Sequence, residues 1–183
     1  MNISITRIVN ASIEILNQEG LNGLTMRKIA DKLQIAAPSL YFHVKDKQQL
    51  YALITERICE IILNQITPQD SLRTICLTAR KEYQAVNHSP QLFVVSPPLT
   101  ENRIALIDIV FDKLRELGVA DEYLMVSGNL LQNYMLAFVT DEKIWENKSE
   151  ATGNMPFELS SINMDQQFEF GLQVIFKGLQ ASS

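Results

Sequence analysis

The sequence has 183 residues, of which 46% are hydrophobic, and a formal net charge of −5 at pH 7. A chain of this length buries roughly 70% of the surface that its unfolded form exposes, which allows one sizeable body or a small head joined to a larger one. Because the sequence has neither an apolar run of 18 residues nor a basic segment followed by an apolar core, we expect no membrane span and no export, and place the protein in the cytoplasm.

Residues that disfavour helices are scarce. There are 7 glycines and 6 prolines, and no stretch alternates apolar and polar side chains as a half-buried strand does. We therefore predict an all-α protein. Cys59 and Cys76 fit a reducing compartment and lack the spacing of a disulfide or metal site, so they are interpreted as small core residues. No metal or other cofactor is expected.

The charge is divided unevenly along the chain. Residues 1–47 hold six Lys or Arg against four Asp or Glu, a net of +2, and the remainder holds 10 against 17, a net of −7. A weakly basic head can dock on DNA through a few phosphate contacts, whereas an acidic body would be repelled. A charged segment is more often only a solvated face, so this asymmetry alone does not establish a DNA partner.

The first predicted helix covers residues 4–19, and Gly20 suits its C-cap. Its apolar side chains recur with helical spacing and form one face. These residues are Ile5, Ile8, Val9, Ile13 and Leu16.

Two short helices with a sharp turn between them come next. The Thr25 hydroxyl can cap the first, whose apolar stripe follows the spacing i, i+3, i+4, i+7. The second begins near Ala36, with Pro38 in its first turn, and packs Leu40 and Val44 inward. The stripe of the first short helix consists of Met26, Ile29, Ala30 and Leu33.

Helices this short need support from flanking helices. Asp46 and Gln49 resemble a capping box that opens a long helix over residues 46–65. The pair of short helices between two longer ones is typical of a helix-turn-helix, whose second helix enters the major groove of DNA.

The N-terminal third of the chain resembles the DNA-binding domain of the TetR family of bacterial transcriptional repressors. The runs Leu24–Ala30 and Ser39–Lys47 carry this resemblance, and residues 168–179 resemble the last helix of the tetracycline-repressor type within the family. The resemblance implies a helix-turn-helix head on a larger helical body that binds an effector and forms a homodimer. We assign residues 1–47 to the head, with 46–65 as the first connecting helix, and 66–183 to the body.

Residues of the head can be given roles in DNA binding. Arg27 can reach a guanine edge with two hydrogen bonds or bind a phosphate. Tyr41, His43 and Lys47 carry donors where phosphates lie in such complexes, and the resemblance favours the same assignment. Packing between helices is the competing interpretation for Tyr41, and a solvated cap for His43. The predicted DNA-binding residues are Thr25, Arg27, Ala37, Pro38, Ser39, Tyr41, His43 and Lys47.

Two positions depart from the family pattern. Gln34 lies in the turn where the family commonly has glycine, because φ is often positive there, and another residue costs roughly 1 kcal/mol. Ala37 replaces a longer polar residue that reads a base in tetracycline repressors, and alanine can contact only a thymine methyl group. We therefore expect a different operator sequence. Lys28 and Lys32 are expected to be solvated.

The rest of the chain is divided by prolines, by Gly118 and by a polar stretch over residues 146–158. Within it, the segment 147–154 is expected to be mobile. Helices are predicted between these breaks. Their ranges are 69–87, 100–117, 121–145 and 164–179.

One recognition helix reads few base pairs, so a twin is expected about one turn of DNA away, roughly 34 to 36 Å. We predict a homodimer through a four-helix interface made by the last two long helices of each chain, with Gly171 and Gly178 allowing close approach. An intramolecular core is the alternative. The predicted interface residues are Leu130, Tyr134, Phe138, Phe168, Gly171, Leu172, Ile175, Gly178 and Leu179.

The resemblance also implies a small-molecule effector, which acts by preferring one arrangement of the two heads. In tetracycline repressors a histidine before a loop holds the metal, but the corresponding segment here, Leu92–Pro98, contains no hard metal ligand. We expect a metal-free and fairly apolar effector. Its candidate contacts, each equally explained by core packing or surface exposure, are Arg80, Tyr83, Asn87, His88, Phe93, Gln132, Asn133 and Trp145.

Two other classes of protein stay open. No Ser-His-Asp, Cys-His or paired-carboxylate arrangement suggests a small helical enzyme, and His43 and His88 are the only histidines. A helical partner-binding module without specific DNA recognition is the second alternative, suggested by Gln34 and Ala37. Salt-dependent binding to a promoter would separate this module from a repressor.

Overall fold

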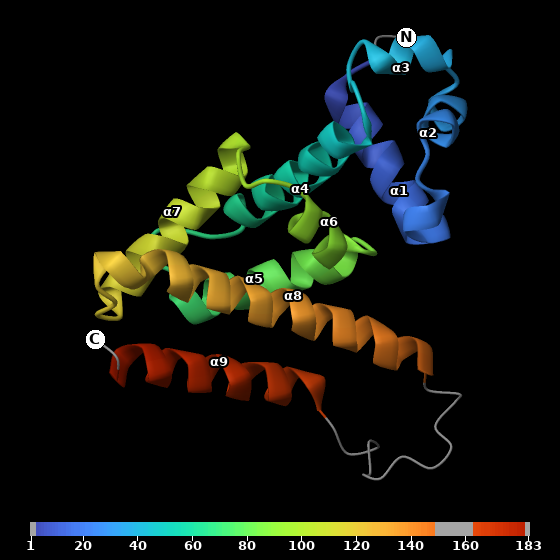
Figure 1. The fold of residues 1–183 in the computed structure, drawn as a ribbon. Helices are drawn as coiled ribbons and strands as arrows, with labels where there is room; N and C mark the ends of the chain where they lie inside the picture. Colours follow the sequence, from blue (N-terminus) through green and yellow to red (C-terminus); the bar gives the residue numbers. More distant parts are fainter. Residues whose placement is uncertain (1–2, 149–162, 182–183) are drawn as a thin grey trace. The chain divides into compact units, whose positions relative to one another are not determined.

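The computed structural model describes residues 3–148 and 163–181, in which every regular element is a helix (Figure 1). The all-α prediction is therefore confirmed. The predicted mobile segment 147–154 lies almost entirely outside the described residues. In chain order the elements are α1 (Ile5–Gly23), α2 (Met26–Leu33), α3 (Ala37–Tyr41), α4 (Lys47–Leu63), α5 (Leu72–Ala85), α6 (Ser89–Val95), α7 (Glu101–Glu116), the 3-10 helix η1 (Asp121–Tyr123), α8 (Leu124–Lys148) and α9 (Met164–Ala181).

The chain forms two compact units. Unit 1 comprises residues 1–67 and 78–106, and unit 2 comprises residues 68–77 and 107–183. Helices α5 and α7 each contribute residues to both units. The functional division predicted from the sequence, with a head over 1–47 and a body from 66, stays a prediction.

The N-terminal helices begin where the capping rules place them. The Thr25 hydroxyl accepts a hydrogen bond from the Lys28 backbone N–H at 3.2 Å, which confirms the predicted cap of α2. Asp46 accepts from the Gln49 N–H at 2.7 Å, and the Gln49 side chain accepts from the Lys45 N–H at 2.8 Å. This reciprocal pair confirms the capping box of α4. The Gln49 side chain here bonds the N–H of Lys45, one residue before the N-cap, whereas the usual box uses the N–H of the N-cap residue itself.

Helix α1 is interrupted where the sequence predicts its end. Gly20 has φ 69° and ψ −172°, so the α-helical backbone stops there before a last turn reaches Gly23. The buried side chains of α1 meet those of α2, α3 and α4 in one core. Each fully buried aliphatic side chain stabilises the fold by about 1.5–3 kcal/mol. The fully buried residues of this core include Ile8, Leu16, Ile29, Leu40, Val44 and Ile54.

The body helices exist as predicted, with ends that differ by a few residues. Helix α5 begins later than residue 69 because the Ser71 hydroxyl accepts from the Thr74 N–H at 3.1 Å and starts the helix there. The short helix α6 was not predicted as an element of its own. It is preceded by His88, whose left-handed backbone with φ 63° separates α6 from α5.

An asparagine pair joins α1 to the turn between α5 and α6 within unit 1. The Asn17 side chain donates to the Ala85 carbonyl at 3.0 Å and accepts from the Asn87 N–H at 2.8 Å. The Asn87 side chain donates in turn to the Asn17 carbonyl at 3.0 Å. The exposed His88 imidazole lies against Gly20 in the same region. These contacts hold the end of the first α1 segment in place.

A second polar junction connects α4, α6 and α7. Glu56 on α4 accepts from the backbone N–H groups of Asn102 at 2.9 Å and Arg103 at 3.3 Å, and so caps the start of α7. The buried Arg103 guanidinium donates to the carbonyls of Ser96 at 2.7 Å and Phe93 at 3.0 Å. Burial lowers the pKa of Arg103 from its usual range. The end of α6 is therefore fixed to the start of α7.

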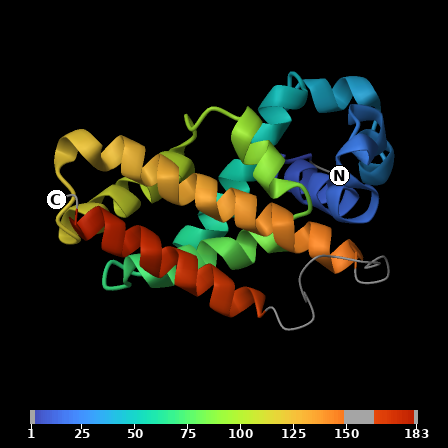
Figure 2. The ribbon, with the colours of Figure 1, turned by 60° about the horizontal axis from the view of Figure 1, so that its bottom comes forward.

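In unit 2, α8 and α9 lie side by side and run antiparallel (Figure 2). The Phe168 side chain is fully buried between them and stacks on Tyr134 with ring centroids 5.5 Å apart. The Tyr134 hydroxyl donates to the Phe168 carbonyl at 2.9 Å. A side chain at Gly171 would collide with this hydroxyl. Glycine at this position therefore allows the close approach of two helices of one chain.

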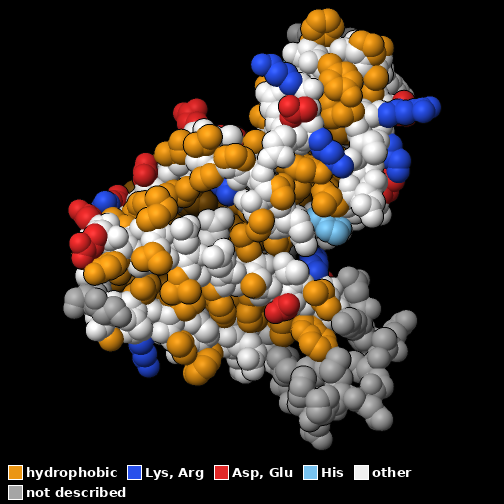
Figure 3. Space-filling view, in the orientation of Figure 1, with side chains coloured by type: hydrophobic (Ala, Val, Ile, Leu, Met, Phe, Trp, Pro, Cys, Tyr) orange, Lys and Arg blue, Asp and Glu red, His pale blue; other side chains and the backbone are white. Residues whose placement is uncertain are grey.

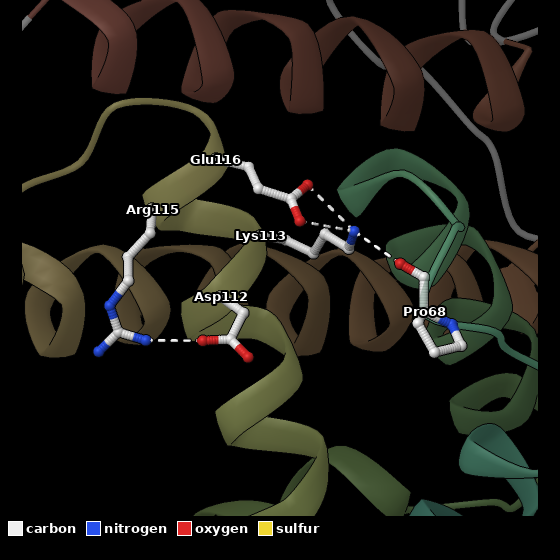
Figure 4. A network of polar contacts seen from close by, with 5 residues as sticks. All are labelled: Pro68, Asp112, Lys113, Arg115 and Glu116. Carbon is white, nitrogen blue, oxygen red and sulfur yellow. Dashed lines mark hydrogen bonds and ion pairs between the residues drawn. The ribbon is translucent and has the colours of Figure 1, made fainter.

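The last turns of α7 carry a network of charged side chains (Figure 4). The nearly buried Lys113 ammonium donates to the Pro68 carbonyl at 2.8 Å and pairs with Glu116 at 2.9 Å. Arg115 pairs with Asp112 at 2.7 Å. The network ties α7 to the segment before α5 within unit 2. Nowhere in residues 3–148 and 163–181 does a helix combine the length and apolar character needed to cross a membrane.

Candidate nucleic-acid interface

The turn between α2 and α3 has the geometry that the sequence predicts. Gln34 adopts the left-handed conformation, with φ 56° and ψ 45°. Its N–H donates to the Asp31 carbonyl at 3.1 Å, and the Ile35 N–H donates to the Ala30 carbonyl at 3.0 Å. These bonds satisfy the carbonyls at the end of α2, and the turn is kept although a non-glycine residue costs about 1 kcal/mol there.

The orientation of α3 is set by Leu40 and Val44, whose side chains are fully buried, as predicted. The other side of α3 faces outward. Tyr41 is 51% exposed and Phe42 is 88% exposed. Figure 3 shows hydrophobic side chains gathered over this end of unit 1, with basic side chains beside them. Together with Ala37 and Pro38, the two aromatic rings line a shallow open pocket.

The basic residues of α2 differ in how they are engaged. Lys28 forms an ion pair with Glu19, and Lys32 pairs with Glu14 at 2.8 Å. Both lysines are exposed, in agreement with the expectation that they are solvated, and α1 also places carboxylates beside them. The Arg27 side chain is 90% exposed, and its nearest carboxylate contact is 3.9 Å. This carboxylate belongs to Asp31, and so long and exposed an ion pair holds Arg27 only weakly.

The remaining predicted contacts lie within α3 or next to the ends of α2, α3 and α4. The Thr25 oxygen accepts the capping bond, so its hydroxyl hydrogen can still be donated to a phosphate oxygen. His43 and Ser39 are half-buried. The exposed Lys47 ammonium stands 5.6 Å from the centroid of the Tyr51 ring. The eight predicted residues thus lie between the N-cap of α2 and the first residue of α4.

Phe42 is the exposed residue of this surface that the sequence reasoning missed. A signal was available, since Leu40 and Val44 form a buried pair four residues apart. A residue midway between them points away from the core. Phe42 therefore joins the candidate interface.

The candidate effector contacts fall into two groups. In unit 1, Arg80, Tyr83 and Phe93 are buried, and the rings of Tyr83 and Phe93 touch with centroids 4.7 Å apart. Asn87 is engaged with Asn17, and His88 is exposed at the same turn. The other three candidates lie on α8 in unit 2, where Gln132 and Trp145 are half-buried and Asn133 is exposed. The predicted effector pocket stays a prediction.

The candidate dimer residues also fall into groups that differ in burial. Phe168 and Leu172 lie in the core of the single chain, and Gly171 faces Tyr134 of the same chain. Leu130 and Gly178 are exposed. The half-buried members of the predicted set are Tyr134, Phe138, Gly171, Ile175 and Leu179. Helical spacing alone could not separate these groups, because contacts within and between chains use the same apolar periodicity.

The described part of the chain contains neither a cluster of metal-binding side chains nor an exposed cysteine. No group of three or more His, Cys, Asp or Glu side chains within it could hold a metal ion. Cys59 and Cys76 are buried, and burial raises the pKa of both thiols to about 12. Both stay protonated near neutral pH and act as core side chains.

Two family patterns match this sequence. Residues 8–54 match the family described as "Bacterial regulatory proteins, tetR family". Residues 63–155 match "Tetracyclin repressor-like, C-terminal domain", which covers half of the chain. The first match contains α2, α3 and the turn between them.

Individual relatives agree with these matches. An HTH-type transcriptional regulator of Saccharopolyspora erythraea is 28% identical over 79% of this chain, and the match spans 63% of that regulator. The class E tetracycline repressor protein of Escherichia coli is 25% identical, with 98% of this chain and 92% of the repressor covered. The crystal structure of the Streptomyces coelicolor TetR family protein ActR in complex with (S)-DNPA has a TM-score of 0.82, 25% identity and full coverage of both chains.

Proposed function

The chain belongs to the tetR family of bacterial regulatory proteins, and from this premise we propose that it represses transcription by binding operator DNA through α2 and α3. The observation that carries the proposal is the outward side of α3, opposite the buried Leu40 and Val44, together with the exposed Arg27 on α2. An α-helix presented in this way fits the major groove, and a guanidinium beside it can bind guanine or phosphate. A repressor of this kind works beside the chromosome, in the cytoplasm.

The proposed binding form is a homodimer on a palindromic operator. Large hydrophobic side chains on α9 remain exposed in the single chain, among them Phe170 at 67% and Val174 at 53%. On α8, Val126 and Leu130 are exposed in the same way. Two copies of this helix pair would cover these side chains in a four-helix interface with twofold symmetry. Two α3 helices would then read two half-sites about one turn of DNA apart.

We propose further that a small molecule releases the repressor from DNA. One relative is a tetracycline repressor, and the similar ActR structure is a complex with (S)-DNPA. The segment Leu92–Pro98 has no metal ligand, so the effector proposed here needs no metal. Thermal denaturation with magnesium and tetracycline tests this point: we expect no stabilisation, and a strong rise in melting temperature would overturn it.

The decisive experiment is a selection of binding sites from random double-stranded DNA by the full chain. We expect enrichment of a palindrome with half-site centres separated by about one helical turn. Binding should weaken steeply as the salt concentration rises, because phosphate contacts release counterions. If no sequence is enriched while the chain is folded and dimeric, the proposal fails and the helical partner-binding module becomes the better interpretation.

A further inference from the structure

The outward side of α3 is unusual in its chemistry. Ala37, Pro38, Tyr41 and Phe42 line one shallow pocket, and both aromatic rings stand at least half exposed in it. An exposed phenyl ring at the tip of a small helix contributes nothing to the core of its own unit. Figure 3 shows hydrophobic side chains gathered on the surface of the N-terminal helices. The pocket therefore suits an apolar group supplied by a partner.

The residues of α3 restrict what it can read in DNA. Helix α3, Ala37–Tyr41, contains no amide, guanidinium or ammonium group. Its polar side-chain groups are the hydroxyls of Ser39 and Tyr41. The side chains of this helix therefore cannot make the bidentate contacts that identify adenine or guanine. Arg27 on α2 can still make such a contact. The apolar group that the major groove does offer is the C5-methyl of thymine.

Charge indicates which partner covers the pocket. Arg27 is exposed on α2, and Lys45 and Lys47 are exposed where α4 begins, so basic side chains come both before and after the apolar helix in the chain. Residues 1–47 carry a positive net charge, whereas the rest of the chain is acidic. A polyanion that also presents methyl groups matches both properties, and double-stranded DNA is such a polyanion.

We propose that the pocket formed by Ala37, Pro38, Tyr41 and Phe42 receives thymine C5-methyl groups in the major groove, and that Phe42 determines specificity for thymine. The inference rests on the proposed function, since it names the base that the operator-binding surface reads. It predicts at least one thymine in each half-site whose methyl group lies against the Phe42 ring.

The test replaces single thymines of the selected operator with deoxyuridine. Deoxyuridine pairs with adenine in the same way and lacks only the methyl group, so shape and hydrogen bonding are kept. At one or two positions of each half-site, we expect the affinity of the wild-type chain to fall about fourfold for each methyl removed. At the other thymines of the operator, the exchange should change nothing.

Phe42→Ala supplies the second arm of the experiment. Because the ring is 88% exposed, this variant should melt at the wild-type temperature. It should bind the thymine operator more weakly than the wild-type chain. At the same positions, replacing thymine with deoxyuridine should no longer lower its affinity. Leu99→Ala is the matched control. Leu99 is 78% exposed in the segment between α6 and α7, and this variant should keep both the wild-type affinity and the loss of affinity on uracil substitution.

The outcomes separate the two proposals. If the chain binds no operator at all, the proposed function fails. If it binds the operator but tolerates uracil at every position, the function stands and the methyl-reading pocket is wrong. If the penalty exists but persists unchanged in Phe42→Ala, another side chain reads the methyl group, and Phe42 faces a different partner.

Discussion

Two surfaces of this protein expose large hydrophobic side chains, and their charges differ. At the end of α3, the exposed rings of Tyr41 and Phe42 belong to residues 1–47, which have a net positive charge. On α8 no charged residue occurs between Leu124 and Thr140, and the exposed side chains there include Val126 and Leu130.

The difference teaches that hydrophobic exposure does not identify a partner by itself. A surface that docks on DNA needs cations around its apolar contacts, since phosphate binding supplies much of the affinity. The core of a protein–protein interface is instead depleted in charge. We therefore assign the α3 surface to DNA and the α8–α9 surface to a second copy of the chain, and each assignment can be broken by substitution.

Gly178→Phe should have the largest effect. The residue is exposed, and a Cβ atom added there has no packing neighbour within 4 Å, so the single chain leaves room for a side chain to start. At a twofold interface the new ring is buried twice, and overpacking should cost about 2–6 kcal/mol of dimer stability. Sedimentation velocity should show monomers, and operator affinity should fall with dimerisation.

The matched control for this change is Gln180→Phe, which adds the same ring at an exposed position two residues further along α9. Two residues turn a helix by more than half a circle, so this ring should point away from the interface. An intact Gly178→Phe dimer with normal operator affinity would remove α9 from the interface.

Arg27→Ala should have the next largest effect. Loss of a guanidinium contact should weaken operator binding by about 1–3 kcal/mol per half-site. Arg57→Ala removes the same charge from α4, where Arg57 pairs with Glu60 at 2.8 Å, and should leave affinity nearly unchanged. Equal losses in both variants, measured by fluorescence anisotropy, would show that net charge matters rather than the position of Arg27. A reduced salt dependence in Arg27→Ala would indicate a phosphate contact, and relaxed specificity at one base a guanine contact.

The α3 surface was largely predictable because its signals are local. The Thr25 cap, the Asp46–Gln49 box and the left-handed Gln34 each depend on residues within four positions in the sequence. The outward direction of Phe42 is a local signal too, because the buried pair Leu40 and Val44 fixes it.

The long-range polar contacts could not be predicted. The asparagine pair Asn17 and Asn87 is separated by 70 positions, and Glu56 caps a helix that starts more than 40 residues later. Amide and carboxylate side chains are compatible with many surroundings, so sequence pattern gives no reason to pair them. The dimer interface on α8 and α9 stays a prediction for another reason. Phe168 and Phe170 are both apolar, and only the packing shows that the first is buried and the second exposed.

Ala37→Gln sharpens the assignment of α3 to the major groove. A glutamine at this position can make two hydrogen bonds to adenine, which a methyl group cannot. We expect a changed preference at one base of each half-site, by about 1 kcal/mol, in a binding-site selection. Ala120→Gln makes the same exchange at an exposed alanine of unit 2 and should leave the preference as it was. If Ala37→Gln selects the wild-type operator, α3 does not present this residue to the bases.

Gln34→Gly should have the smallest effect and tests the turn that presents α3. Glycine adopts φ 56° without strain, but it also gives the unfolded chain more freedom, so the net stabilisation should be about 0.5–1 kcal/mol. For a chain of this size the melting temperature should rise by about 1–4 °C. Gln34→Ala removes the same amide but keeps a Cβ atom, and should bring no gain. Operator preference should stay the same in both variants, because the side chain at this position serves the turn. A lower melting temperature in Gln34→Gly would mean that the Gln34 side chain stabilises the turn by more than its backbone strain costs.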